Sequence, residues 1–187
     1  MSASALPRMT ADEFIAWALA QPEGERYELV NGRIVIVAPE RATHVRAKQR
    51  IVRKLEDAIA ASRLPCEAFV DGLAVQVDNA TIYEPDVLVR CGSPIHGETL
   101  RILDPLIVVE VLSPSSRSRD AGLKLADYFR IPSLRHYLIV ATDTRTVIHH
   151  VRDETGAILT QIIRDGMVPL DPPGLRLDDI FPGEPEP

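Results

Sequence analysis

The stretch LIVVEVLSPSS, from Leu106 to Ser116, joins a seven-residue run typical of a buried β-strand to a Ser- and Pro-rich segment. Short runs of branched apolar residues that end in turn-forming residues predict a strand buried on both faces. Period-two alternation puts Glu110 on the same face of this strand as Val108 and Leu112. Because an ionised carboxylate is costly to bury alone, Glu110 must be paired, protonated, at a strand end or bound to a cation.

The segments on either side of this strand alternate between helical and β-like patterns. Apolar residues at helical spacing predict helices at residues 10–20, 42–61 and 119–130. Apolar and β-branched runs predict strands at residues 66–70, 73–77 and 83–89, read as a meander, and at 106–112, 136–140, 144–151 and 157–163. The strand, helix, strand order between residues 106 and 140 implies a crossover and a parallel pair. The sequence therefore predicts an α/β fold with a mixed sheet.

Two local motifs lie near the start of the chain. Thr10 and Glu13 form a capping-box pattern at the start of the first predicted helix. The segment YELVNGRIVIV, residues 27–37, has two β-rich arms around Asn31-Gly32, which is the strongest short hairpin signal. A two-residue turn at this place puts Glu28 opposite Val35.

The composition is that of an ordinary globular protein. The chain has 187 residues, 45% hydrophobic content and a formal net charge of −6. We expect a single domain over residues 1–187, with a core at about 10–165 and an irregular Pro-rich tail at 172–187. The apolar runs are far shorter than the ~20 residues that cross a bilayer, and the first residues resemble no signal peptide, so a cytoplasmic protein is expected. Cys66 and Cys91 lack metal or disulfide-framework spacing and are expected to be thiols.

Two further acids accompany Glu110 on predicted strands. EPDVLVR places Asp86 at the head of an apolar run, where Pro85 limits the strand to an edge or a start. Glu28 lies within the strand RYELV. Carboxylates on three strands suit Mg²⁺ or Mn²⁺, which prefer oxygen ligands. The alternative is that these acids pair with arginines or face solvent.

The serines of SPSSRSRD lack a G-x-S-x-G elbow and favour a turn and helix cap over a nucleophile.

Four of these motifs, in order, carry a resemblance. YELVNG, PDV, VEVLSPSS and the Lys-bearing helix RDAGLKLADYF resemble the Uma family, a branch of the PD-(D/E)XK restriction-endonuclease-like superfamily, from about Thr10 to Val151. The resemblance implies a restriction-endonuclease-like mixed β-sheet core flanked by helices. It also implies Mg²⁺- or Mn²⁺-dependent hydrolysis of DNA phosphodiesters, and it leaves a homodimer possible.

The resemblance assigns roles to particular residues. It makes Asp86 and Glu110 the metal-binding acids, with the backbone carbonyl of Val111, and Glu28 an additional catalytic acid. The superfamily places a lysine two residues after the second acid, but this chain has Leu112 there.

For the missing lysine, the resemblance points to Lys124 on the following helix, which would stabilise developing phosphate charge or orient water. The alternative is an ordinary surface lysine. His44 occupies a position where Uma sequences often carry histidine, and it is either an additional site residue or a structural one.

The predicted long helix carries a basic strip. Residues 41–54 contain six Arg or Lys and no acid, and a helical projection gathers Arg46, Arg50 and Arg53 away from the apolar face, which is formed by Val45, Val52, Leu55 and Ile59. This strip either contacts DNA phosphates or is a solvated helix face. Two functions therefore remain open: a metal-dependent DNA endonuclease, or a catalytically silent nuclease-fold protein that serves as a nucleic-acid-binding or assembly module. A hydrolase of small phosphoesters is a third option, but the sequence has no phosphate-cradling Gly loop.

Overall fold

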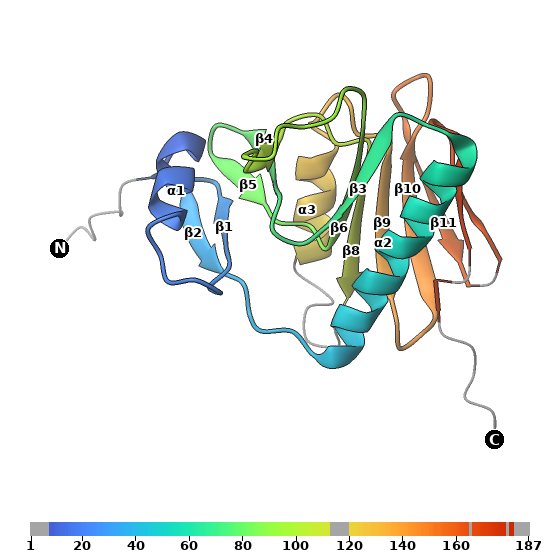
Figure 1. Cartoon of the computed structure of the whole chain (residues 1–187), viewed down its shortest axis with the longest axis horizontal. Coiled ribbons are helices and arrows are strands. Elements are labelled where there is room, and N and C mark those ends of the chain that lie inside the picture. Colours follow the sequence, from blue (N-terminus) through green and yellow to red (C-terminus); the bar gives the residue numbers. More distant parts are fainter. Residues whose placement is uncertain (1–7, 113–119, 165, 179, 182–187) are drawn as a thin grey trace.

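A computed structural model of the chain describes residues 8–112, 120–164, 166–178 and 180–181 (Figure 1). The segment SPSSRSRD, and with it the predicted turn and cap, lies outside the described residues except for Asp120. The helices are α1 (Ala11–Ala18), α2 (Ala42–Ser62) and α3 (Asp120–Tyr128). None of the helices in the described part of the chain combines the length and apolar character that a membrane crossing requires.

A six-stranded mixed sheet forms the centre of the fold. Its order is β11 (Ile158–Ile163), β10 (Thr146–Arg152), β9 (His136–Ala141), β8 (Ile107–Leu112), β6 (Val87–Cys91) and β3 (Cys66–Val70). The strands β8 and β9 are parallel, with Glu110 opposite Ile139, and α3 lies in the connection between them. The predicted α/β fold and its crossover are confirmed.

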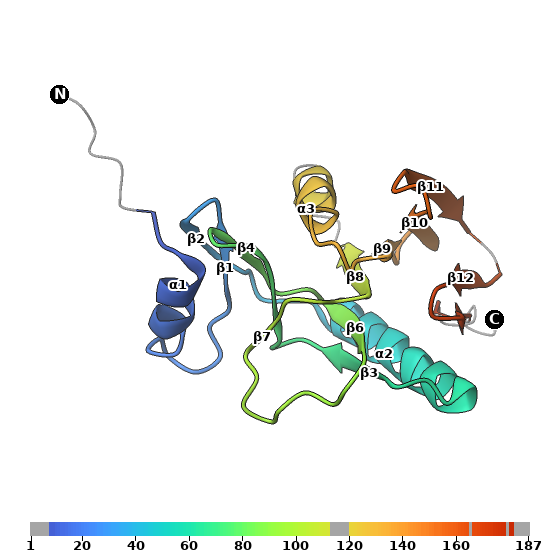
Figure 2. The ribbon, with the colours of Figure 1, turned by 90° about the horizontal axis from the view of Figure 1, so that it is seen from above.

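Helices cover both faces of this sheet, as the view from above shows (Figure 2). Ile51, Leu55 and Ile59 of α2 pack against one face, on which Val109 of β8 also lies. Tyr128 of α3 packs against the other face, with Val108. Glu110 lies between Val108 and Leu112 in the alternation, so its side chain is on the α3 face. The prediction that Val45 lies on the apolar face is wrong, because this side chain is 36% exposed.

A smaller five-stranded sheet lies beside the six-stranded sheet (Figure 1). Its order is β2 (Arg33–Ile36), β1 (Tyr27–Val30), β5 (Thr81–Tyr83), β4 (Ala74–Asp78) and β7 (Arg101–Ile102). The predicted hairpin is confirmed: Glu28 pairs with Val35, and Asn31 and Gly32 both have positive φ. The capping box of Thr10 and Glu13 is present as well.

The predicted meander is wrong. The strand β3 pairs with β6, whereas β4 pairs with β5 and β7 in the other sheet. The run 83–89 is split at Pro85, which cannot donate to a ladder, so β5 ends at Tyr83 and β6 begins at Val87. The chain changes sheets at Asp71-Gly72, where both residues have positive φ.

The pairing of β3 with β6 also corrects the expectation for the cysteines. Cys66 and Cys91 are directly opposite in this register, with Cα atoms 3.9 Å apart, and they form a disulfide. They are not free thiols. An expectation based on sequence spacing missed this pair because it placed residues 66–70 beside 73–77 instead.

The predicted irregular tail is only partly irregular. A two-stranded sheet of β12 (Val168–Leu170) and β13 (Leu175–Leu177) packs onto the α2 side of the large sheet. Leu175 and Leu177 are buried there. Residues 175–177, which were expected to be irregular, therefore form a strand that contributes to the core.

Candidate active site

A cleft of about 450 Å³ opens where the two sheets meet the start of α2. Its walls include Glu28 of β1, Asp86 before β6, Glu110 of β8 and Lys124 of α3, together with His44 in the first turn of α2. Residues 35–41, which comprise the end of β2 and its connection to α2, also line the cleft. The fold therefore brings together every candidate side chain of the predicted catalytic and metal-binding set, and His44 with them.

The carboxylate of Asp86 is held from both sides. Its Oδ2 accepts the backbone N–H of Val111 at 2.6 Å, and its Oδ1 lies 3.1 Å from Nε2 of His44 and 3.6 Å from Nζ of Lys48. Burial acts to raise the pKa of Asp86, but the hydrogen bond and charge of His44 and the other donors outweigh burial and lower that pKa. The same contact raises the pKa of His44 although burial opposes it. Asp86 is therefore fixed in orientation and ionised.

Glu110 has a different electrostatic environment. Its Oε1 accepts hydrogen bonds from Nζ of Lys124 at 3.1 Å and from the hydroxyl of Tyr128 at 2.9 Å. Burial raises its pKa most strongly; Lys124 opposes this, and the charges of Asp86 and Glu28 add to it, so that the pKa is about 7. The ionised form of Glu110 is therefore disfavoured, chiefly by burial and in addition by the two neighbouring carboxylates.

Lys124 connects the two sheets. Its Nζ lies 2.8 Å from Oε1 of Glu28 on β1 as well as 3.1 Å from Oε1 of Glu110 on β8. Burial alone would lower its pKa, but Glu110 and Glu28 raise it far above the ordinary range, so the ammonium is retained. The side chain is 15% exposed, which contradicts the alternative of an ordinary surface lysine.

A second group of charges lies behind Asp86, and the sequence did not indicate it as part of the site. Lys48 is 1% exposed and pairs with Glu40 and, at 2.7 Å, with Asp71. Arg26 contacts Glu40 at 2.5 Å and Asp71 at 3.3 Å. The available signal was a lysine on the apolar side of a helix, where burial requires partners.

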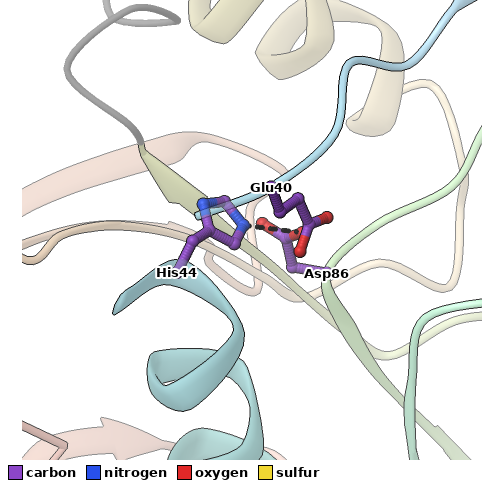
Figure 3. Close-up of side chains that lie close together, drawn as sticks. All are labelled: Glu40, His44 and Asp86. Atoms are coloured by element: carbon purple, nitrogen blue, oxygen red, sulfur yellow. Dashed lines mark hydrogen bonds and ion pairs between the residues drawn. The ribbon is translucent and has the colours of Figure 1, made fainter. Parts of the chain in front are cut away.

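Glu40, His44 and Asp86 come close enough to suggest a metal site, since one ligand atom from each lies within 4.8 Å of the others (Figure 3). However, Oε1 of Glu40 is bound by Arg26 and Oε2 by Lys48. Two protein cations therefore already neutralise this carboxylate. Among the described residues, by contrast, both hydrogen-bond donors to Glu110 contact Oε1, so no donor is assigned to its Oε2.

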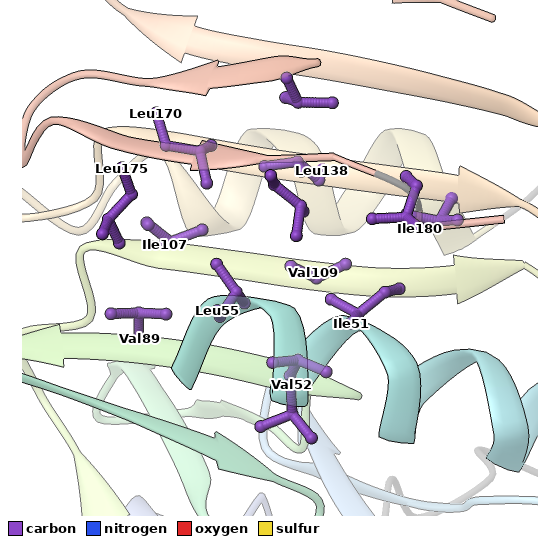
Figure 4. Packing of buried hydrophobic residues seen from close by; sticks show 14 of the residues in the cluster. Ile51, Val52, Leu55, Val89, Ile107, Val109, Leu138, Leu170, Leu175 and Ile180 are labelled. Atoms are coloured by element: carbon purple, nitrogen blue, oxygen red, sulfur yellow. The ribbon is translucent and has the colours of Figure 1, made fainter. Parts of the chain in front are cut away.

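The predicted basic strip is exposed on α2 but lies outside the cleft. Arg46, Arg50 and Arg53 line a shallow groove of about 420 Å³ along the helix. The opposite side of α2 packs Ile51 and Leu55 onto the sheet (Figure 4). The strip therefore runs along the outer surface of the helix whose first turn carries His44.

The mixed sheet flanked by helices is the fold expected for the restriction-endonuclease-like class, and a family match supports this class. The chain belongs to the family Uma2, described as putative restriction endonuclease, which matches residues 11–180. Two relatives from Synechocystis sp. (strain PCC 6803) are the uncharacterized proteins slr1290 and sll1609. The first is 29% identical over 79% of this chain and 77% of its own length, and the second 27% identical over 67% and 72%.

A solved structure has the same fold. It is the crystal structure of a putative nuclease belonging to DUF820 from Anabaena variabilis, with a TM-score of 0.71 and 19% sequence identity. The alignment covers 92% of this chain and 97% of that one.

Proposed function

We propose that this protein is a nuclease that hydrolyses DNA phosphodiester bonds with Mg²⁺ or Mn²⁺. The observation that carries the proposal is the convergence of the Asp86 and Glu110 carboxylates with the Lys124 ammonium in one cleft, although they come from three separate segments of the chain. Membership of the family Uma2 supports nuclease activity in general. The finer assignment rests on the chemistry of the cleft.

The residues of the cleft fit a hard divalent cation. The proposed ligands are the carboxylates of Asp86 and Glu110 and the backbone carbonyl of Val111, and all three are oxygen donors of the kind that Mg²⁺ and Mn²⁺ prefer. The pKa of Glu110 is raised mainly by burial, and the charges of Asp86 and Glu28 add to it; a bound cation would oppose both effects. When bound, the ion would polarise a phosphate oxygen and lower the pKa of a water molecule.

The other side chains of the cleft prepare this site. The N–H of Val111 and the His44 ring hold the Asp86 carboxylate in place, and the hydroxyl of Tyr128 holds that of Glu110. Lys124 would bring its positive charge to the scissile phosphate, where it stabilises charge that develops in the transition state. Glu28 keeps the Lys124 ammonium charged and oriented toward β8.

Binding of the DNA backbone is assigned to the strip of Arg46, Arg50 and Arg53. These guanidinium groups are exposed on the same helix that carries His44 into the cleft, and guanidinium groups match phosphate geometry. Each phosphate contact contributes about 0.9 to the logarithmic salt slope of duplex binding. Replacing all three arginines by glutamine should therefore reduce the slope by up to about 2.7. Arg176→Gln, exposed on β13, is the matched control.

Cleavage of supercoiled plasmid in Mg²⁺ or Mn²⁺ tests the proposal directly. Asp86→Ala and Glu110→Ala should each lose at least about 100-fold in rate, while Asp104→Asn, an exposed acid paired with Arg90, should cleave normally. Equal cleavage by all four proteins would refute the assignment of the site. A parallel reaction with single-stranded RNA decides the nucleic-acid preference.

The second candidate function is a silent nuclease-fold protein that binds nucleic acid or assembles with partners. The specific feature that favours it is Leu112, at the position where the superfamily carries its lysine. This candidate predicts DNA binding that depends on the arginine strip, with no cleavage in either metal. The enzyme hypothesis predicts DNA binding through the same strip together with metal-dependent cleavage.

A further inference from the structure

The strand β11 is an exposed edge of the six-stranded sheet with an apolar surface. Within the described residues it pairs only with β10, and three of its side chains are strongly exposed: Ile158 at 39%, Leu159 at 50% and Ile162 at 66%. Residues 157–163 contain no charged residue, no proline and no glycine. This edge lies on the opposite side of the molecule from β1 and β2 (Figure 1).

Edges of this kind are normally protected against pairing with another chain by charges, prolines, bulges or covering loops. β11 has none of the first three, since its ladder with β10 runs through six consecutive pairs without a register shift. The other edge of the same sheet, β3, is protected: it contains Glu67, whose carboxylate accepts the N–H of Ile95 from a neighbouring loop. The difference between the two edges leaves β11 open to pairing with another strand.

The sequence of β11 is complementary to itself. A two-fold axis perpendicular to a sheet makes the edge strands antiparallel and places one residue opposite its own copy. With the axis at Thr160, Ile158 meets Ile162 of the second copy, Ala157 meets Ile163 and Thr160 meets Thr160, whereas Leu159 meets the polar Gln161. Apolar cross-strand pairs and Thr–Thr pairs are both stabilising. An axis at Gln161 would instead set Ile158 against Arg164, which is less favourable.

We propose that two copies of this chain form a two-fold symmetric dimer through antiparallel pairing of their β11 strands, centred on Thr160. The two six-stranded sheets then become one continuous twelve-stranded sheet. One strand pair buries less area than the roughly 1,200–2,000 Å² of a stable interface, so the dimer dissociates on dilution, with a dissociation constant on the order of micromolar. This inference does not depend on the proposed nuclease activity.

Sedimentation velocity of the full chain tests the dimer. Between about 1 and about 200 µM, a range that brackets a micromolar constant, the sedimentation coefficient should rise from that of a monomer to that of a dimer. Ile162→Lys should remain monomeric throughout, because it buries a charge beside Ile158 of the second copy. Leu103→Lys is the control: Leu103 is 60% exposed before β8, and this variant should dimerise like the unchanged protein.

Cross-linking tests the register. Thr160→Cys should form a disulfide-linked dimer under mild oxidation, because directly opposite residues in an antiparallel pair have Cβ atoms about 5 Å apart. Glu154→Cys, exposed in the turn before β11, should not. A protein that stays monomeric at the highest concentration overturns the proposal. So does a dimer that survives Ile162→Lys, because it would assemble through another surface, such as the exposed edge β2.

Discussion

Lys124→Met should destabilise the protein because it removes the ammonium between two buried carboxylates and leaves the side-chain length almost unchanged. The Nζ atom lies 2.8 Å from Oε1 of Glu28 and 3.1 Å from Oε1 of Glu110. At an effective dielectric constant of ~20, these distances correspond to about 6 and about 5 kcal/mol of attraction. The desolvation of the three ions costs several kcal/mol each and offsets most of this attraction energy.

The net cost follows from what remains after the substitution. Removing one partner of a buried ion pair costs about 3–5 kcal/mol. Glu110 relieves part of that cost, because its pKa is already about 7 and it accepts a proton at neutral pH with little free energy. Glu28 makes the shorter contact with Lys124, so it loses more attraction energy in the substitution than Glu110 does. We expect a loss of about 3 kcal/mol, which corresponds to about 6–12 °C in Tm for a chain of this size.

Urea unfolding at pH 7.5 in the presence of EDTA measures this loss without bound metal. The control is Arg130→Met, because Arg130 is 52% exposed in its pair with Asp78 and should cost no more than about 1 kcal/mol. Adding Glu28→Gln to Lys124→Met should recover about 2 kcal/mol, and adding Glu110→Gln should recover less. The reasoning is refuted if Lys124→Met costs no more than the control, or if Glu110→Gln is the better rescue.

Three further predictions concern stability alone. Burial lowers the pKa of His149 from the ordinary 6.5 to about 4, so the native state binds fewer protons than the unfolded chain between these values. Stability is therefore complete above pH 6.5 and decreases as the pH falls toward 4, by about 2 kcal/mol at pH 5; His149→Gln should flatten this dependence in urea titrations, and an unchanged slope would contradict it. Tyr128→Phe removes the hydrogen bond to Glu110 and should lower the free energy of unfolding by about 1.5 kcal/mol in thermal melts, whereas an unchanged Tm would show that the hydroxyl contributes nothing. Thr10→Ala removes the cap of α1 and should cost about 1 kcal/mol by chemical denaturation, and a stabilised variant would exclude the capping role.

The features that could be predicted from the sequence depend on residues close together in the chain. Asn31-Gly32 requires positive φ at two adjacent positions, and a tight hairpin turn supplies it whatever lies elsewhere. The strand of Glu110 was equally recognisable, because six of the seven residues from Leu106 to Leu112 are apolar and a short run of this kind has few other structures available. In both cases the local preference and the tertiary contacts agree.

The features that could not be predicted depend on which distant segments pair. At Asp71-Gly72 the sequence permits a hairpin between neighbouring strands, but the chain turns into the other sheet. Glu84 accepts the N–H of Gly72 there, and Lys48 pairs with Asp71. Both partners come from elements that are separate in sequence, so no local pattern reveals them. The Cys66–Cys91 disulfide was missed for the same reason, since it follows directly once β3 is known to pair with β6.

Leu112 shows why the position of a lysine in the sequence is a poor guide to its position in the cleft. Leu112 and Glu110 are on the same face of β8, and α3 crosses that face in the connection to β9. A lysine at either place, position 112 or position 124, starts from the α3 side of the sheet, and the structure puts the Nζ of Lys124 in contact with Glu110. The position on the helix provides a second contact, because Lys124 also reaches Glu28 on the other sheet. The same ammonium therefore stabilises the junction between the two sheets and remains charged within the cleft.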